Sequence, residues 1–176
     1  MRLVDENGCD VPAGQPGELW VSSPFVMYGY LDDPISTAEV LTDGWYHTGD
    51  VFRQDERGLY FFLDRISAMI KTGGENVYPN EVESVLRKHP SVMDCAVFSV
   101  PDPKWGEAVA AALVPEDGSI DLRDVHAFAK ENLAGYRKPQ YYTVLSELPK
   151  TASGKTDRRA LKESNSCTLT SIKELE

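Results

Sequence analysis

The chain has 176 residues, of which 41% are hydrophobic and 26% are charged, a balance typical of a soluble globular protein. Its net charge of -10 argues against nonspecific binding to nucleic acid or to an acidic membrane. No apolar stretch approaches the ~20 residues that cross a bilayer, and no C-x-x-C pair indicates a metal or dithiol site. The three cysteines lie far apart, which fits a reducing compartment, so we expect a cytoplasmic protein without a metal site.

Residues 1–64 are predicted to be rich in β-structure. A hairpin turns at residues 6–8, "GELWVSS" predicts a strand, and a second hairpin turns within residues 55–58. The stretch "DDPISTAEVL" predicts the one helix of this half, which Asp33 can cap and whose first turn suits Pro34. Because a core of this size is marginal, we interpret the segment as the truncated end of a larger domain.

From about residue 66 onward, helices and strands alternate. The stretches "YPNEVESVLRKHP" and "DLRDVHAFAKENL" carry apolar residues at helical spacing, and "KTDRRALKE" predicts a terminal helix. Strands in "SVMDCAVFSV", "EAVAAALVP" and "QYYTVLSEL" predict a small α+β domain over residues 68–163, with helices packed on a three-stranded sheet. The polar residues 164–176 predict a flexible tail.

The stretch "PKTASGKTDRRAL" contains Lys155 in a sequence similar to the end of a phosphate-binding P-loop. The motif G-x-x-x-x-G-K-[ST], however, needs glycine where this chain has Pro149, and proline removes an N–H group that would face phosphate. A nucleotidase or kinase with a P-loop is therefore disfavoured. Taken alone, the stretch also fits a solvated lysine that precedes a terminal helix.

Four stretches occur in a fixed order: "GELWVSSPFVMYGYLDDP", "DGWYHTGDV", "FFLDRISAMIKTGGENVYPNEVE" and "LPKTASGKTDRRAL". From about Gly17 to Leu161, this order resembles the adenylate-forming superfamily of acyl- and aryl-CoA synthetases, peptide adenylation domains and beetle luciferases. In that family a carboxylate attacks the α-phosphate of ATP to give an acyl-adenylate, and a thiol, usually of coenzyme A, then displaces AMP. The resemblance implies a large N-terminal domain and a small mobile C-terminal domain that offers a different face to each step.

The resemblance implies roles for three charged residues. Asp50 in "YHTGD" matches the aspartate that binds the ribose hydroxyls of ATP, and Arg65 in "LDRIS" matches an arginine near the ribose and phosphate. Lys155 matches the catalytic lysine, whose point charge suits the charge that develops at phosphorus. A mobile loop around Lys155 would suit a residue needed in only one step. Without the other motifs, residues 47–50 also fit an ordinary turn that closes a hairpin.

Residues 65–67 are predicted to form the hinge between the two parts. The family usually pivots on Lys or Asp two residues after the arginine, whereas this chain has Ser67 followed by Ala68. Small side chains permit backbone rotation but lack the charge that steadies one state, so domain alternation is either tuned differently or impaired. Arg65 itself also fits a structural role as a partner of Asp64 or Glu75.

The stretch "KTGGENVYP" supplies the candidate loop for the thioester step, with Lys71, Gly73, Gly74 and Glu75. The two glycines can adopt positive φ and let a ligand pass close to the backbone. The resemblance implies that this loop lines the pantetheine tunnel, whereas the alternative is a plain turn between a strand and a helix. The similarity of "MIKTGGENVYPNEVE" to CoA-ligase sequences favours a CoA synthetase within the family.

We therefore expect the C-terminal part of an AMP-forming acyl- or aryl-CoA synthetase. The resemblance implies that the full-length enzyme uses a small carboxylic acid, ATP with Mg²⁺ and CoA, with the N-terminal domain in cis. The phosphate loop and the acyl pocket of that domain have no counterpart here, so we expect the isolated chain to be inactive and to bind none of these ligands tightly. A noncatalytic binding or regulatory module, which the departure at Ser67 and Ala68 leaves open, is the alternative.

Overall fold

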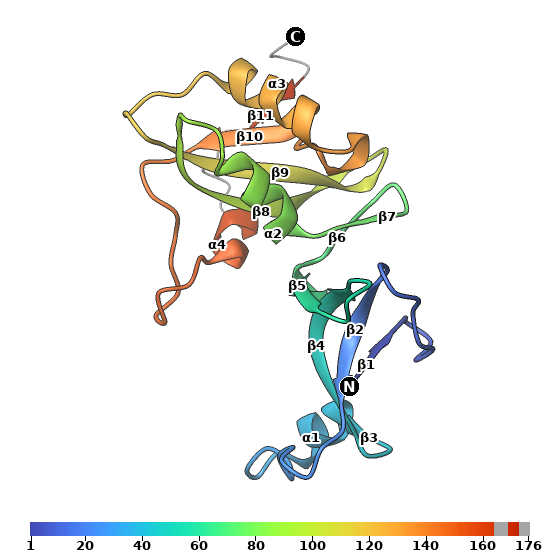
Figure 1. Cartoon of the computed structure of the whole chain (residues 1–176). Helices are drawn as coiled ribbons and strands as arrows, with labels where there is room; N and C mark the ends of the chain where they lie inside the picture. The colour runs from blue at the N-terminus through green and yellow to red at the C-terminus, as the bar shows by residue number, and fades with distance from the viewer. Residues whose placement is uncertain (164–168, 173–176) are drawn as a thin grey trace. The chain divides into compact units, whose positions relative to one another are not determined.

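The computed structural model describes residues 1–163 and 169–172. It divides into two compact units, residues 1–67 and 68–176, which are described separately (Figure 1). Cys167 and most of the predicted tail lie outside the described residues. Within the described ranges, no helix is both long enough and apolar enough to cross a membrane.

The first unit is an antiparallel sheet in the order β1-β2-β4-β3, with β5 also paired to β4. Both predicted signals for its helix are confirmed, because the Asp33 side chain accepts a hydrogen bond from Ser36 N and Pro34 begins α1. The predicted hairpin at residues 55–58 is also confirmed and joins β4 to β5. The elements are β1 (Arg2–Val4), β2 (Pro16–Val21), α1 (Pro34–Val40), β3 (Leu41–Thr42), β4 (Trp45–Gln54) and β5 (Tyr60–Arg65), followed by the 3₁₀ turn η1 (Ile66–Ala68).

The second unit is a six-stranded mixed sheet in the order β11-β10-β9-β6-β7, with β8 also paired to β9. Its α+β class is confirmed. The elements are β6 (Ile70–Thr72), β7 (Glu75–Val77), α2 (Pro79–Leu86), β8 (Val92–Asp102), β9 (Gly106–Pro115), α3 (Leu122–Asn132), the 3₁₀ turn η2 (Gly135–Arg137), β10 (Tyr141–Val144), α4 (Arg158–Glu163) and β11 (Thr170–Ser171).

The sheet of the second unit is larger than the three strands that the sequence predicts. The predicted strands correspond to β8, β9 and β10, whereas β6, β7 and β11 are additional. These three strands contain two or three residues each, too few to show an alternating pattern. Thr170 in β11, within the segment predicted as a tail, pairs with Tyr142 of β10.

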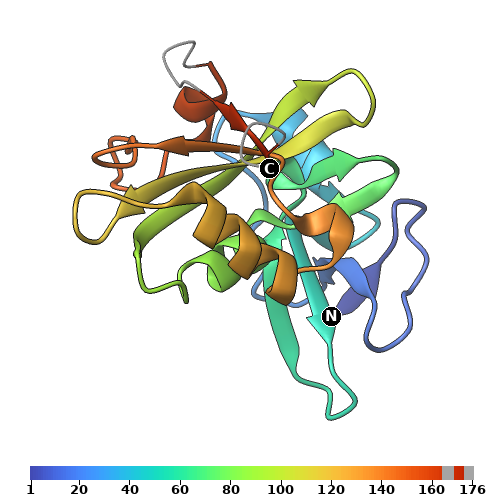
Figure 2. The same ribbon diagram turned by 90° about the horizontal axis from the view of Figure 1, so that it is seen from above.

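Helices cover both faces of this sheet, α2 and α3 on one face and α4 on the other (Figures 1 and 2). Val82 of α2 and Val125 of α3 belong to the first core cluster, whereas Leu161 of α4 packs in a second cluster with Phe98. The central strand β9 is buried throughout residues 108–114, which explains why it is a continuous run of Ala, Val and Leu.

The first unit, by contrast, encloses little apolar surface. Its buried hydrophobic residues are Leu3, Val4, Val51 and Leu63. Several large apolar side chains lie almost wholly exposed between β2 and α1 and within α1; they are Phe25, Tyr28, Leu31 and Ile35. Patches of this kind usually mark a surface that another part of a protein covers.

We therefore expect the two units to differ in stability within the isolated chain. Backbone amides in β8 and β9 should be the slowest to exchange with solvent, because opening them exposes both core clusters. Amides in β2 and β4 should exchange at least about tenfold faster, because their unit has a smaller core. Native-state hydrogen exchange measures this difference, and equal protection of the two units would contradict it.

Candidate functional site

The two candidate nucleotide-binding residues, Asp50 and Arg65, lie opposite each other on β4 and β5. Arg65 Nε lies 2.8 Å from Asp50 Oδ1, and their side chains are 63% and 26% exposed. The backbone N–H of Arg65 also donates to Asp64 Oδ1 at 2.8 Å, so Arg65 contacts its neighbour Asp64 as well. An exposed ion pair contributes only about 0.2–1 kcal/mol, so a ligand that offers hydrogen-bonding groups can compete for either member.

Asp50 lies at a bulge in the middle of β4. The register against β2 passes from Glu18↔Val51 to Trp20↔His47, which leaves two more residues between the paired positions of β4 than between those of β2. The bulge is irregular because Gly49 has a φ of 68°. The alternative of a turn that closes a hairpin is therefore wrong for residues 47–50, which run through the strand.

Side chains of β2 hold this bulge in place. Gly49 N donates to Glu18 Oε1 and Trp20 Nε1 donates to Glu18 Oε2, each at 2.9 Å. The Trp20 and His47 rings stack with their centroids 3.8 Å apart. These supporting residues were not predicted from the sequence, although Glu18 and Trp20 stand two apart in a strand and therefore share one face.

The glycine pair lies in the tight turn between β6 and β7, in the second unit. Gly73 and Gly74 have φ values of 58° and 87°, as the sequence analysis expected of this turn. Their surroundings differ, because a Cβ atom on Gly73 would lie 2.7 Å from Trp105 Cε3, whereas one on Gly74 would meet no atom within 4 Å. Gly73 N also donates to Trp105 O at 3.0 Å.

The strand that leads into this turn is fixed by Glu107 of β9. Lys71 N donates to Glu107 Oε2 at 3.0 Å, and Ser99 Oγ donates to Glu107 Oε1 at 2.7 Å. The Lys71 side chain is exposed. Trp105 and Glu107 form a "WGE" triplet that the sequence analysis did not single out.

A pocket of about 250 Å³ opens beside the glycine turn. Trp105 and Tyr136 contribute two partly exposed aromatic rings, and Glu75 contributes a carboxylate. An apolar recess with a few polar groups is a common form of ligand site. The lining residues are Thr72, Gly73, Glu75, Trp105, Val109, Gly135, Tyr136 and Gln140.

Lys155 lies in a small hairpin before α4. Lys150 and Thr156 form a β-bridge, Thr151 N donates to Lys155 O at 2.8 Å, and Gly154 makes the turn with a φ of 81°. The Lys155 side chain is exposed, and among the described residues its ammonium group has no hydrogen bond or ion pair. The charge of Lys155 is therefore available to a ligand on a backbone that hydrogen bonds define.

The lysine hairpin and the glycine turn lie on opposite sides of the second unit. In both views the loop before α4 and the β6–β7 hairpin point away from each other (Figures 1 and 2). The candidate hinge residue Ser67 is exposed and is the last residue of the first unit. The structure therefore brings Asp50 and Arg65 together and separates Lys155 from Gly73 and Gly74.

Comparisons with known proteins give consistent matches for this chain. Residues 81–155 match the AMP-binding enzyme C-terminal domain. The chain is 49% identical over 156 residues to a feruloyl-CoA synthase of Amycolatopsis sp, covering 88% of this chain and 32% of that protein. It is 43% identical over 162 residues to a long-chain-fatty-acid–CoA ligase of Escherichia coli O6:H1, covering 92% of this chain and 29% of that protein.

Solved structures of enzymes with related names match this chain as well. An o-succinylbenzoate CoA synthetase from Bacillus subtilis, in complex with an acyl-adenylate intermediate, gives a TM-score of 0.86 at 36% identity over 94% of this chain and 34% of that chain. An amide bond synthetase from Marinactinospora thermotolerans gives a TM-score of 0.85 at 40% identity over 92% of this chain and 33% of that chain. This chain therefore spans about a third of the length of the proteins it matches.

The two glycines should respond differently to substitution by alanine. Gly74→Ala should lower the free energy of unfolding by about 1–2 kcal/mol, the cost of a left-handed conformation for a residue with a Cβ atom. Gly73→Ala should cost about 1–3 kcal/mol more, because its Cβ atom also overlaps the Trp105 ring. Urea denaturation of the chain measures both values. In a Trp105→Ala background the difference between the two variants should disappear, and its persistence would contradict the steric explanation.

Proposed function

This chain belongs to the adenylate-forming superfamily as its C-terminal part, and we propose that it completes an AMP-forming acyl- or aryl-CoA synthetase. In the first step a carboxylate oxygen attacks the α-phosphorus of ATP, and the bond from that phosphorus to the bridging oxygen of pyrophosphate breaks. In the second step the sulfur of CoA attacks the acyl carbon, and AMP leaves with the electron pair of the acyl–oxygen bond.

The observation that carries this proposal is the placement of Lys155 and the glycine turn on opposite sides of one unit (Figures 1 and 2). Two groups that serve successive steps at one reaction centre need such an arrangement if the unit turns between the steps. We propose that Ser67 and its neighbours form the pivot, because a few residues at the end of an element can absorb such a rotation.

In the adenylation step, Lys155 supplies positive charge where negative charge develops on the α-phosphate. Its exposed ammonium group, with no described partner, requires no internal ion pair to break first. Asp50 accepts hydrogen bonds from the ribose hydroxyls, and Arg65 holds the Asp50 carboxylate in place through their 2.8 Å contact.

In the thioester step, the glycine turn lets the thiol-bearing arm of CoA pass close to the backbone. The pocket between Trp105 and Tyr136 offers apolar walls to that arm, with Glu75 at its border. Lys71, at the start of the turn, projects an exposed side chain that can attract an anionic ligand.

The resemblance also implies Mg²⁺, which would accompany ATP. Among residues 1–163 and 169–172, no group of three His, Cys, Asp or Glu side chains is arranged to hold a metal ion. Because Mg²⁺ is usually held by one or two carboxylates together with substrate phosphates, it would come to the site with the nucleotide.

A second candidate concerns the acceptor in the second step. The similarity to an amide bond synthetase is 40% identity, comparable to the 43% identity to a long-chain-fatty-acid–CoA ligase. An amine could therefore replace the CoA thiol in attacking the acyl-adenylate. Supplying CoA or an amine to the full-length protein with acyl-adenylate, and identifying the product by mass, distinguishes the two acceptors. Turnover with either acceptor would exclude the noncatalytic module.

Substitution of Lys155 should separate the two steps in the full-length protein that carries this chain. Lys155→Ala should slow acid-dependent exchange of pyrophosphate into ATP by roughly 10²–10³-fold, because the charge opposite the α-phosphate is lost. Thioester formation from preformed acyl-adenylate should change much less. Lys150→Ala, which removes an exposed lysine from the same hairpin, is the matched control. Equal slowing of both steps, or of neither, would contradict the proposed role.

The isolated chain should bind ATP or AMP weakly or not at all. Asp50 and Arg65 supply only part of the proposed site, and the resemblance implies that the N-terminal domain supplies the phosphate loop. Calorimetric titration of the 176-residue chain with ATP measures this affinity. A dissociation constant in the micromolar range would contradict the expectation and indicate an independent nucleotide site.

A further inference from the structure

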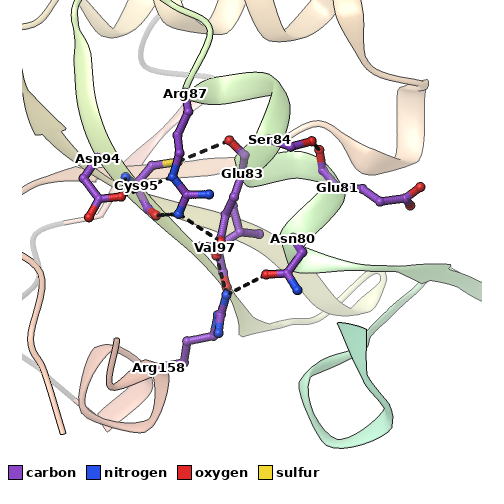
Figure 3. A network of polar contacts seen from close by, with 9 residues as sticks. All are labelled: Asn80, Glu81, Glu83, Ser84, Arg87, Asp94, Cys95, Val97 and Arg158. Atoms are coloured by element: carbon purple, nitrogen blue, oxygen red, sulfur yellow. Dashed lines mark hydrogen bonds and ion pairs between the residues drawn. The ribbon is translucent and has the colours of Figure 1, made fainter. Parts of the chain in front are cut away.

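A buried carboxylate on α2 organises a network of polar contacts in the second unit (Figure 3). Glu83 is 2% exposed. Its Oε1 atom accepts from Val97 N at 2.8 Å and from Arg158 Nη2 at 2.7 Å, and its Oε2 atom accepts from Arg87 Nη2 at 3.2 Å. Two guanidinium groups and a backbone N–H therefore compensate a charge that would otherwise be costly to bury.

The same network covers the free edge of β8. Among the described residues this strand pairs with β9 only, so no described strand lies beside its outer N–H and C=O groups. Glu83 accepts from Val97 N, and Arg158 Nε donates to Val97 O at 3.2 Å. The Glu83 carboxylate and the Arg158 guanidinium therefore bond to the N–H and C=O groups of Val97 in the way that a neighbouring strand would. These are the backbone groups that an exposed strand edge leaves unpaired.

Arg158 begins α4 and follows the lysine hairpin directly. The preceding residue, Asp157, closes the base of the hairpin, because its N–H donates to Pro149 O at 2.8 Å. Asp157 Oδ1 also accepts from Ala160 N at 3.0 Å, which caps α4. The contact of Arg158 with the edge of β8 therefore fixes the end of the hairpin that carries Lys155.

We propose that Glu83 and Arg158 are positioning residues for Lys155, which hold its hairpin in one place against the edge of β8. This inference rests on the proposed function for its catalytic consequence, whereas the anchoring itself is a property of the second unit. Lys155 then moves with the whole unit and not as part of an independent loop. Small displacements of a catalytic group are costly, since about 1 Å can reduce a rate about 10²-fold.

The anchoring is tested first by hydrogen exchange on the 176-residue chain. In Arg158→Ala the amides of Thr151 and Asp157, which close the hairpin, should lose at least about tenfold in protection, while amides of β9 change less. Arg159→Ala, the same change one residue later on the exposed side of α4, should leave the hairpin amides unchanged. An equal loss over the hairpin and β9 would show a general structural role and overturn the proposal.

The catalytic consequence is tested in the full-length protein by measuring the two half-reactions separately. Arg158→Ala should lower kcat for adenylation about 10–100-fold and leave thioester formation from preformed acyl-adenylate nearly unchanged. Arg158→Lys, which keeps the charge but cannot hold both Glu83 and Val97, should lie between the alanine variant and the wild type. Arg87→Ala, which removes the other guanidinium from Glu83, should affect adenylation less than Arg158→Ala does.

The outcomes separate failure of this inference from failure of the proposed function. Suppose that the hairpin amides exchange faster in Arg158→Ala but its adenylation rate is unchanged, while Lys155→Ala is inactive in adenylation. That combination would overturn the positioning role. Where Lys155→Ala has no effect on adenylation, the proposed function fails, and the exchange measurement still decides whether Arg158 anchors the hairpin. Unaltered exchange in Arg158→Ala would overturn the anchoring in either case.

Discussion

The buried carboxylate of Glu83 is the constraint on which the arrangement of the second unit depends. A negative charge with 2% exposure is tolerated only where donors surround it, and its donors here are Arg87 at the end of α2, Val97 in β8 and Arg158 at the start of α4. Satisfying Glu83 therefore joins α2 to the edge of β8 and to the start of α4. The contacts that satisfy Glu83 therefore also hold the hairpin that carries Lys155 in place.

The other candidate site, the glycine turn, lies within the same sheet, between its strands β6 and β7. Because β9 is buried on both faces, helices cover both faces of the sheet. The glycine turn follows β6, which is paired to β9, whereas the lysine hairpin follows β10 and precedes α4. The two candidate reaction loops are therefore carried by different connections of one sheet.

In the first unit, the geometry of the candidate site depends on local contacts and not on a large core. Its ion pair between Asp50 and Arg65 is set by strand register and by the bulge at Gly49, which local contacts hold. Yet the unit exposes Phe25 and Leu31 almost fully, so its own core covers only part of its apolar surface. Local geometry at a site and the stability of the segment that carries it are therefore separate properties in this chain.

The sequence by itself determined the α+β class, the main helices, the Asp33 cap of α1 and the family, because periodicity, capping residues and motif order are local features that can be read along the chain. Tertiary structure alone decided what each candidate residue touches. It paired Arg65 with Asp50, placed the Trp105 ring against Gly73, and added strands too short to leave a pattern. It also joined Glu83 to Arg158, which are 75 positions apart in the sequence, at the edge of β8. No local sequence pattern reveals that β8 lies at an edge of the sheet. Such contacts depend on which strand forms the edge of the sheet, and the order of the strands is fixed only when the whole domain has folded.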